Sequence, residues 1–157
     1  MIGRLFRHLF APSAARLFPE PSMQRIAAAV ARGEATHSGE TCFAVESSLP
    51  LRAVFAGVQA RDRAIEAFSR LRVWDTAGNN GVLLYLLLAD HRIEIVADRG
   101  LHQRVSDEQW RGVCLLMEER LRAGDPEAAA VAGIEAASRL VAEHFPRVGD
   151  GPGENEL

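Results

Sequence analysis

The chain has 157 residues, a length that fits one domain and allows a substantial buried core. Hydrophobic residues make up 48% of it and charged residues 25%, which is the balance of an ordinary soluble globular protein. The net charge of −3 provides no general attraction for nucleic acid, so we exclude nucleic acid as a partner.

The cysteines and the apolar runs indicate the compartment. Cys42 and Cys114 are too few for a disulfide scaffold and have no metal-ligand spacing, so we expect two buried thiols in a reducing environment. The longest apolar run, residues 81–89, is shorter than the roughly 20 residues of a membrane-spanning helix. The opening MIGRLFRHLF resembles the front of a signal peptide, but Arg7 and His8 interrupt it before an apolar region forms. We therefore expect an uncleaved cytoplasmic protein, with peripheral contact to the inner membrane left open.

Residues 2–18 have the pattern of a short basic amphipathic helix. Arginine and histidine side chains lie opposite an apolar stripe that consists of Ile2, Leu5, Phe6, Leu9 and Phe10. Three roles stay open for this segment: packing on the domain or remaining a loose tail, lying on a membrane surface, or contacting a partner protein. Strong anchoring by the segment alone is not expected, because it is short.

The next elements are a helix and a strand. Ser22 is placed to cap a helix that runs to about residue 35. HSGE, residues 37–40, reads as a turn, and TCFAVES, residues 41–47, has the apolar and β-branched content of a strand. These residues predict a helix that turns directly into the first strand of a sheet.

A loop and a second helix follow. Residues 49–58 are expected to form a loop with apolar anchors. Residues 60–73 predict a helix in which Ile65, Phe68 and Leu71 face inward and the charged residues face water.

An apolar run and an alternating run then predict a β-hairpin. Residues 81–89 are almost continuously apolar, which suits a strand covered on both faces. Asp90 and His91 form a tight break, and residues 92–97 alternate as a second strand does. Because the break is short, we expect the two strands to pair antiparallel.

The loop after this hairpin, DRGLHQRV, leads into a helix with a clear start signal. Ser106 and Gln109 have the spacing of a capping box, and Val105 and Trp110 have that of a hydrophobic staple. This helix is expected to end at Gly124.

Asp125 and Pro126 open a last helix that runs to about Phe145. The polar end of the chain predicts a disordered tail. We therefore divide the chain into an amphipathic N-terminal segment (1–21), an α/β domain (22–146) and a disordered tail (147–157).

The order of elements predicts an α/β fold: a three-layer α/β/α sandwich around a small mixed sheet, made of a βαβ unit and a β-hairpin. The strands at 41–47 and 81–89 are then parallel and start at the same edge of the sheet, where the strand at 92–97 ends. Three loops, residues 38–40, 75–80 and 98–100, should meet there. We call this place the loop edge.

The loop edge gathers oxygen-bearing side chains: Glu40, Asp75, Thr76, Asn79, Asn80 and Asp98. Carboxylate and amide oxygens suit a hard cation such as Ca²⁺ or Mg²⁺, and no motif for an organic cofactor is present. The alternative is that turn chemistry alone explains these residues, since turns favour the same residue types. The five histidines are scattered, and we expect them to be surface or capping groups.

Four separated motifs, HSGE-TCFAVE, WDTAGNNGVLLYLLL, HRIEIVADRG and the Trp110 helix with its closing EHFP, occur in an order that resembles the TPM domain family. The resemblance covers residues of roughly 22 to 146 and indicates a short bacterial form. The family's usual second motif has Thr, a short gap and then R-N-G-V-L. This chain has Asn79 in place of that Arg, which puts any phosphate-binding role of the Arg in doubt.

The resemblance implies an α/β/α sandwich and divalent-metal binding at the loop edge, by Glu40, Asp75, Thr76, Asn80 and Asp98, with Gly100 beside them. It also implies weak acid phosphatase activity, as in some plant members. Two hypotheses follow. One is a non-catalytic accessory module that acts on an unidentified protein or membrane-associated partner. The alternative is a metal-assisted phosphomonoesterase in which Asp75 and Asp98 bind metal or act as the base and Asn80 orients phosphate.

Overall fold

The computed structural model describes residues 2–148, so residues 149–157 of the predicted tail lie outside it. The elements in chain order are α1 (Ile2–Leu9), α2 (Ala14–Leu17), α3 (Glu20–Glu34), β1 (Glu40–Glu46), α4 (Leu51–Phe55), α5 (Ala60–Arg70), β2 (Gly81–Leu87), the 3₁₀ turn η1 (Leu88–Asp90), β3 (Arg92–Ala97), α6 (Arg99–His102), α7 (Asp107–Arg122) and α8 (Pro126–His144).

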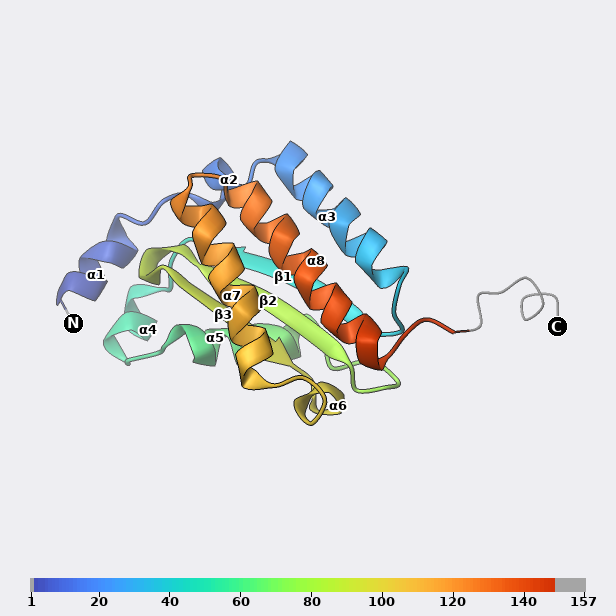
Figure 1. Ribbon diagram of the computed structural model, residues 1–157. Helices are drawn as coiled ribbons and strands as arrows, with labels where there is room; N and C mark the ends of the chain where they lie inside the picture. The colour runs from blue at the N-terminus through green and yellow to red at the C-terminus, as the bar shows by residue number, and fades with distance from the viewer. Residues whose placement is uncertain (1, 149–157) are drawn as a thin grey trace.

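The sheet has three strands in the order β1-β2-β3 (Figure 1). β1 runs parallel to β2, with Glu40 opposite Gly81, and α5 lies in the connection between them. β3 runs antiparallel to β2, with Val82 opposite Ala97. The predicted βαβ unit and hairpin are therefore confirmed.

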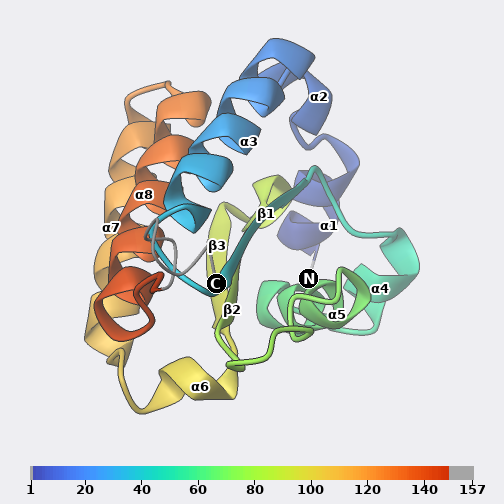
Figure 2. The same ribbon diagram turned by 90° about the vertical axis from the view of Figure 1, so that its right-hand side faces the viewer.

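Helices cover both faces of this sheet. α3, α7 and α8 lie on one face and α4 and α5 on the other, as the two views show (Figures 1 and 2). All seven residues of β2 are buried, and alternate side chains enter separate cores. One core, shared with α3, α7 and α8, takes Val82, Leu84 and Leu86, and the other, shared with α5, takes Leu83, Tyr85 and Leu87. The predicted three-layer sandwich is confirmed.

The start of α3 differs from the prediction. The helix begins at Glu20 after Pro19, and Pro21 occupies its first turn, where a missing N–H costs nothing. Ser22 lies inside the helix, where its hydroxyl is buried and donates a hydrogen bond to Glu127 at 2.8 Å. Ser22 therefore ties α3 to the start of α8 and caps no helix.

The buried face of α5 also differs from the prediction. Its inward residues are Ala60, Ala64 and Ala67, whereas Ile65 and Leu71 are 49% and 50% exposed. Small side chains at spacings of four and three residues let the helix approach the sheet closely. The prediction was wrong for Ile65 and Leu71, because it ranked inward positions by side-chain size, whereas Phe68 is partly buried against the core as predicted.

Two stretches expected to be loops each contain a short helix, α4 and α6. The capping box of α7 is confirmed: Ser106 accepts a hydrogen bond from the Gln109 N–H, and the Gln109 side chain accepts one from the Ser106 N–H. Gly124 follows α7 with a φ of 82°. Across residues 2–148, none of the helices combines the length and the apolar content that spanning a bilayer requires.

Candidate functional site

Three loops meet at the loop edge, as the topology predicts. The Asn80 side-chain amide donates a hydrogen bond to the Ser38 hydroxyl at 3.3 Å, which joins the loops before β2 and β1. The Gly100 N–H donates to the Asn79 carbonyl at 2.8 Å, which joins the loop before β2 to the one after β3. Residues between Ser38 and Gly100, far apart in the chain, therefore form one local structure.

The backbone is packed tightly where these loops touch. A Cβ on Gly39 would lie 2.5 Å from the Asn80 carbonyl oxygen, and a Cβ on Gly100 would lie 2.5 Å from the carbonyl oxygens of Gly78 and Asn79. Asn79 has a φ of 52°, a left-handed conformation that asparagine tolerates better than most residues. The loop edge therefore places several main-chain carbonyls close together.

Asn80 occupies the centre of the loop edge and is only 1% exposed. Its N–H donates to the Thr76 hydroxyl at 3.0 Å, and its side-chain amide donates to Ser38. Its side-chain oxygen Oδ1 is buried and has no hydrogen-bond partner among the described residues. Leaving a buried acceptor unpaired costs about 1–3 kcal/mol, so this oxygen is available to a ligand that brings positive charge or a donor.

Two of the predicted carboxylates stabilise local turns. Asp75 is exposed and accepts a hydrogen bond from Arg72 at 3.0 Å. Asp98 caps α6 by accepting the Arg99 N–H on Oδ1 at 2.8 Å. Turn chemistry therefore accounts for one bonded oxygen of each carboxylate.

Glu40 has the most unusual electrostatic environment of the predicted set. Partial burial, and then the charges of Glu34 and Asp75, raise the pKa of its carboxyl. Glu34 was not predicted: its Oε2 accepts the Thr41 N–H at 2.8 Å from the end of α3. The available signal was its position, which is immediately before the predicted turn. Negative charge therefore accumulates beside the start of β1.

The oxygen-bearing groups at the loop edge suit a hard cation better than a transition metal. The described residues contain no group of three or more His, Cys, Asp or Glu side chains that could hold a metal ion. A cation at the loop edge would therefore depend on the Asn80 amide oxygen, main-chain carbonyls, water and the Glu40 carboxylate. Ca²⁺ and Mg²⁺ accept such oxygen ligands, whereas zinc prefers nitrogen and sulfur.

His37 also lies beside the loop edge, but it is fully buried and not at the surface as predicted. Its Nδ1 accepts the Gly39 N–H at 3.1 Å, so the ring proton is on Nε2, which faces the Thr41 hydroxyl at 3.4 Å. Burial is the main cause that lowers the pKa of His37. In this arrangement the imidazole donates to the hydroxyl and cannot take its proton.

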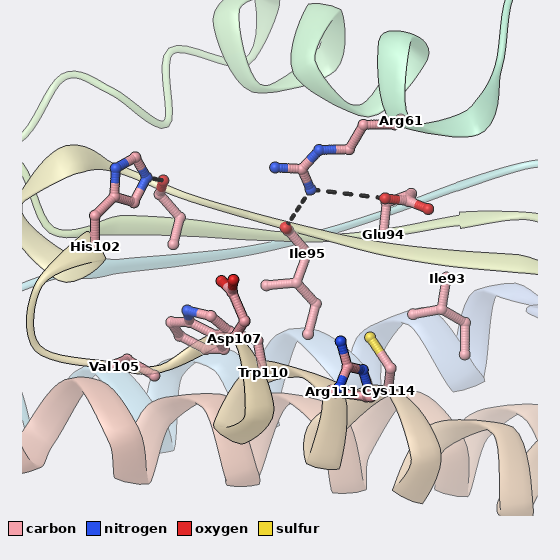
Figure 3. A pocket seen from close by; sticks show the side chains of 11 residues that line it. Arg61, Ile93, Glu94, Ile95, His102, Val105, Asp107, Trp110, Arg111 and Cys114 are labelled. Carbon is pink, nitrogen blue, oxygen red and sulfur yellow. Dashed lines mark hydrogen bonds and ion pairs between the residues drawn. The ribbon is translucent and has the colours of Figure 1, made fainter.

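A separate cavity of about 410 Å³ follows the outer edge of β3, between α5 and α7 (Figure 3). The Arg61 guanidinium donates to the Ile95 carbonyl at 2.6 Å and lies 3.6 Å from Glu94. The His102 Nε2 lies 2.7 Å from the Ala97 carbonyl. These side chains cover carbonyls that point away from β2, so they protect the open edge of the sheet. No predicted site residue lines this cavity.

The geometry agrees with the results of comparison with known proteins. The family model described as the TPM domain matches residues 13–140 of this chain. A similar solved structure is the NMR structure of the BA42 protein from the psychrophilic bacterium Bizionia argentinensis. It has a TM-score of 0.73 and 26% sequence identity over 88% of this chain and 90% of that one. Among curated proteins, none matches this chain. The resemblance expected from the motifs is confirmed, and this chain belongs to the TPM domain family.

Proposed function

We propose that this chain is a non-catalytic accessory domain of the TPM type that binds one Ca²⁺ or Mg²⁺ ion at the loop edge. The observation that carries the proposal is the buried, unpaired Oδ1 of Asn80. A cation would satisfy this oxygen and would also compensate the charges of Glu34 and Asp75, which add to burial in raising the pKa of Glu40. Carboxylate and amide oxygens together are ligands of the kind that hard cations prefer.

The hydrogen bonding of His37 and the raised pKa values of the two cysteines support a non-catalytic role. His37 donates to Thr41, which is the reverse of what a general base requires. Burial raises the pKa of Cys42 to about 12 and that of Cys114 to about 11, so both thiols stay protonated near neutral pH. Both cysteines are free, which supports a reducing compartment, and we propose the cytoplasm.

Calorimetric titration with CaCl₂ and with MgCl₂ tests the cation site. We expect saturable binding by the wild type, and about tenfold weaker binding by Glu40→Gln, which keeps the shape of the side chain and removes its charge. Glu119→Gln is the matched control, because Glu119 is an exposed carboxylate on α7, outside the loop edge. Absence of binding heat together with an unchanged melting temperature would refute the cation site.

Hydrolysis of an aryl phosphate, with and without each cation, tests the non-catalytic assignment. We expect no turnover above the buffer rate. Steady turnover that requires the cation and disappears in Asp98→Asn would overturn the assignment and favour the phosphomonoesterase instead. Turnover that survives both the substitution and chelation would belong to a contaminant and would leave the expected result in place.

A further inference from the structure

The N-terminal helix α1 docks on the domain through its polar side. Arg4 donates to both carboxylate oxygens of Asp90. Its Nε lies 3.3 Å from Oδ1 and 3.1 Å from Oδ2, and its Nη2 lies 3.0 Å from Oδ2. His8 accepts the Leu49 N–H on Nδ1 at 2.9 Å, so its Nε2 carries the proton and donates to Asp90 Oδ1 at 2.9 Å. The side chains of Arg4, His8 and Asp90 are only 13%, 0% and 8% exposed. We call these three residues the Asp90 cluster.

The apolar side of α1 consequently faces outward. Phe6 and Phe10 stack with their ring centres 6.2 Å apart, yet both lie at the surface. The exposed fractions are 70% for Ile2, 55% for Phe6, 50% for Leu9 and 78% for Phe10, and we call these four residues the exposed stripe. An amphipathic helix of a globular protein ordinarily buries this side, so the stripe is a candidate contact surface.

The neighbouring helix α4 adds further apolar surface at the same end of the molecule. α4 packs against α1, and the two views place them on the same side of the sheet (Figures 1 and 2). On α4, Leu51 is 41% exposed and Phe55 is 60% exposed, whereas Val54 between them is fully buried. The outward positions therefore carry large apolar side chains on both helices.

The charged side chains of the two segments that carry this surface have one sign. Residues 2–18 and 49–58 contain no aspartate or glutamate, although the whole chain has a net charge of −3. Arg7 and Arg52 are exposed at this end, and the nearby carboxylate of Asp90 is paired with Arg4, His8 and, at 3.5 Å, Arg7. The apolar surface therefore lies on segments whose net charge is positive.

We propose that the exposed stripe, together with Leu51 and Phe55, docks on an anionic lipid bilayer. Apolar side chains of this kind enter the boundary between headgroups and acyl chains, and arginines beside them pair with lipid phosphates. Charge decides between this occupant and a second copy of the chain, because a symmetric contact would bring two positively charged surfaces together. The helix is short, so binding is weak, reversible and sensitive to salt.

The proposed contact leaves the loop edge free. α1 contacts η1, at the end of β2 remote from Gly81, and the seven residues of β2 separate the two places by about 20 Å. A bilayer at α1 therefore leaves the cation site facing the aqueous phase, so loss of either function can be measured without disturbing the other.

Co-sedimentation of the full chain with vesicles tests the proposal. One vesicle type contains phosphatidylcholine alone, and the other contains three parts phosphatidylcholine to one part phosphatidylglycerol. We expect binding to the anionic vesicles only, reduced at high salt, and about tenfold weaker binding by the double variant Phe6→Ser/Phe10→Ser. The matched control, Ile65→Ser/Leu115→Ser, changes two apolar residues of comparable exposure, 49% and 54%, outside α1 and α4 and should bind like the wild type. Circular dichroism verifies that each variant is folded.

Three outcomes would overturn the proposal. The first is failure of the folded wild type to bind anionic vesicles. The second is equal binding by the wild type and Phe6→Ser/Phe10→Ser, or equal binding to both vesicle types. The third is self-association in analytical ultracentrifugation that the Phe6→Ser/Phe10→Ser change abolishes while no vesicles bind, which would assign the surface to a second copy.

Discussion

Removal of the Asp90 carboxylate tests how the N-terminal helix is held. In Asp90→Ala, the Arg4 guanidinium and the buried His8 ring both lose their acceptor. If α1 stayed in place, the buried positive charge of Arg4 would lose its carboxylate partner and keep only the Val58 carbonyl, which costs roughly 3–5 kcal/mol. The chain has a cheaper response, because undocking α1 returns both side chains to water.

Because α1 can undock, the loss of stability measured for Asp90→Ala cannot exceed the free energy that holds α1 on the domain. Without Asp90, α1 keeps the packing against α4, the part-buried Leu5, the bond from the Leu49 N–H to His8 and the bond from Arg4 to the Val58 carbonyl. We therefore expect the free energy of α1 docking to fall by about 3 kcal/mol, which raises the undocked fraction by roughly a hundredfold. Global unfolding should change by less, because neither core of the sandwich is altered.

Hydrogen exchange measured by mass spectrometry separates these two effects. The amides of residues 2–10 should exchange roughly a hundredfold faster in Asp90→Ala than in the wild type, while those of β2 keep their protection. Glu119→Ala, an exposed carboxylate substitution on α7, provides the control. The reasoning fails if α1 keeps its protection, or if β2 loses protection to the same extent as α1.

Acid should release α1 from the wild type. Burial raises the pKa of Asp90, but the hydrogen bonds from Arg4 and His8 outweigh it and leave the pKa below its ordinary value of 3.8. A lowered pKa means that the stabilisation is present above pH 3.8 and is lost as the pH falls through the pKa of the folded state. Exchange of residues 2–10 should therefore accelerate below pH 3.8 in the wild type and not in Asp90→Ala.

Three further predictions concern other parts of the fold. The pKa of Glu40 is raised, so its ionisation lowers the stability of the fold above its ordinary pKa of 4.5. Glu40→Gln should therefore melt at a higher temperature than the wild type at neutral pH without added cation. Equal melting temperatures would contradict this. Tyr85→Phe removes a 2.7 Å hydrogen bond to the Glu46 carboxylate and should cost about 1.5–3 kcal/mol in urea unfolding, and a smaller loss would show that water replaces the hydroxyl. Arg61→Ala uncovers a carbonyl on the open edge of β3 and should increase self-association measured by light scattering, whereas Arg111→Ala, in the same cavity, should not.

The sheet could be predicted from the sequence because its central signal is unambiguous. The run at 81–89 is apolar on both alternating faces, which requires cover on both sides and hence three layers. α4 and α6 were missed because helices of five and four residues are too short to show a helical period. The face of α5 was assigned wrongly because alanine carries little hydrophobic signal, although it packs best where a helix approaches a sheet closely.

The position of the loop edge could be predicted from the sequence, but the burial and hydrogen bonding of its side chains could not. Parallel strands start at the same edge, so topology alone brought residues 38–40, 75–80 and 98–100 together. The burial of Asn80 and the closeness of Glu34 depend on tertiary packing, which no spacing along the chain records. Asp75 and Asn80 looked equivalent in sequence, yet one is exposed and paired with arginine and the other is buried with a free oxygen.

In the N-terminal segment, the helical period of apolar residues identified an apolar face and a polar face. It did not say which of the two faces packs against the domain. Asp90 looked like part of a plain turn, but it lies 86 positions from Arg4 and selects the polar face. Hydrogen bonds to a charged group contribute about 1.5–3 kcal/mol each, and burying one large apolar side chain contributes a similar amount. On the protein alone the two orientations of α1 are therefore closely balanced. Beside a bilayer, only the observed orientation satisfies the Asp90 cluster and the exposed stripe together, so lipid should increase the protection of residues 2–10 against hydrogen exchange.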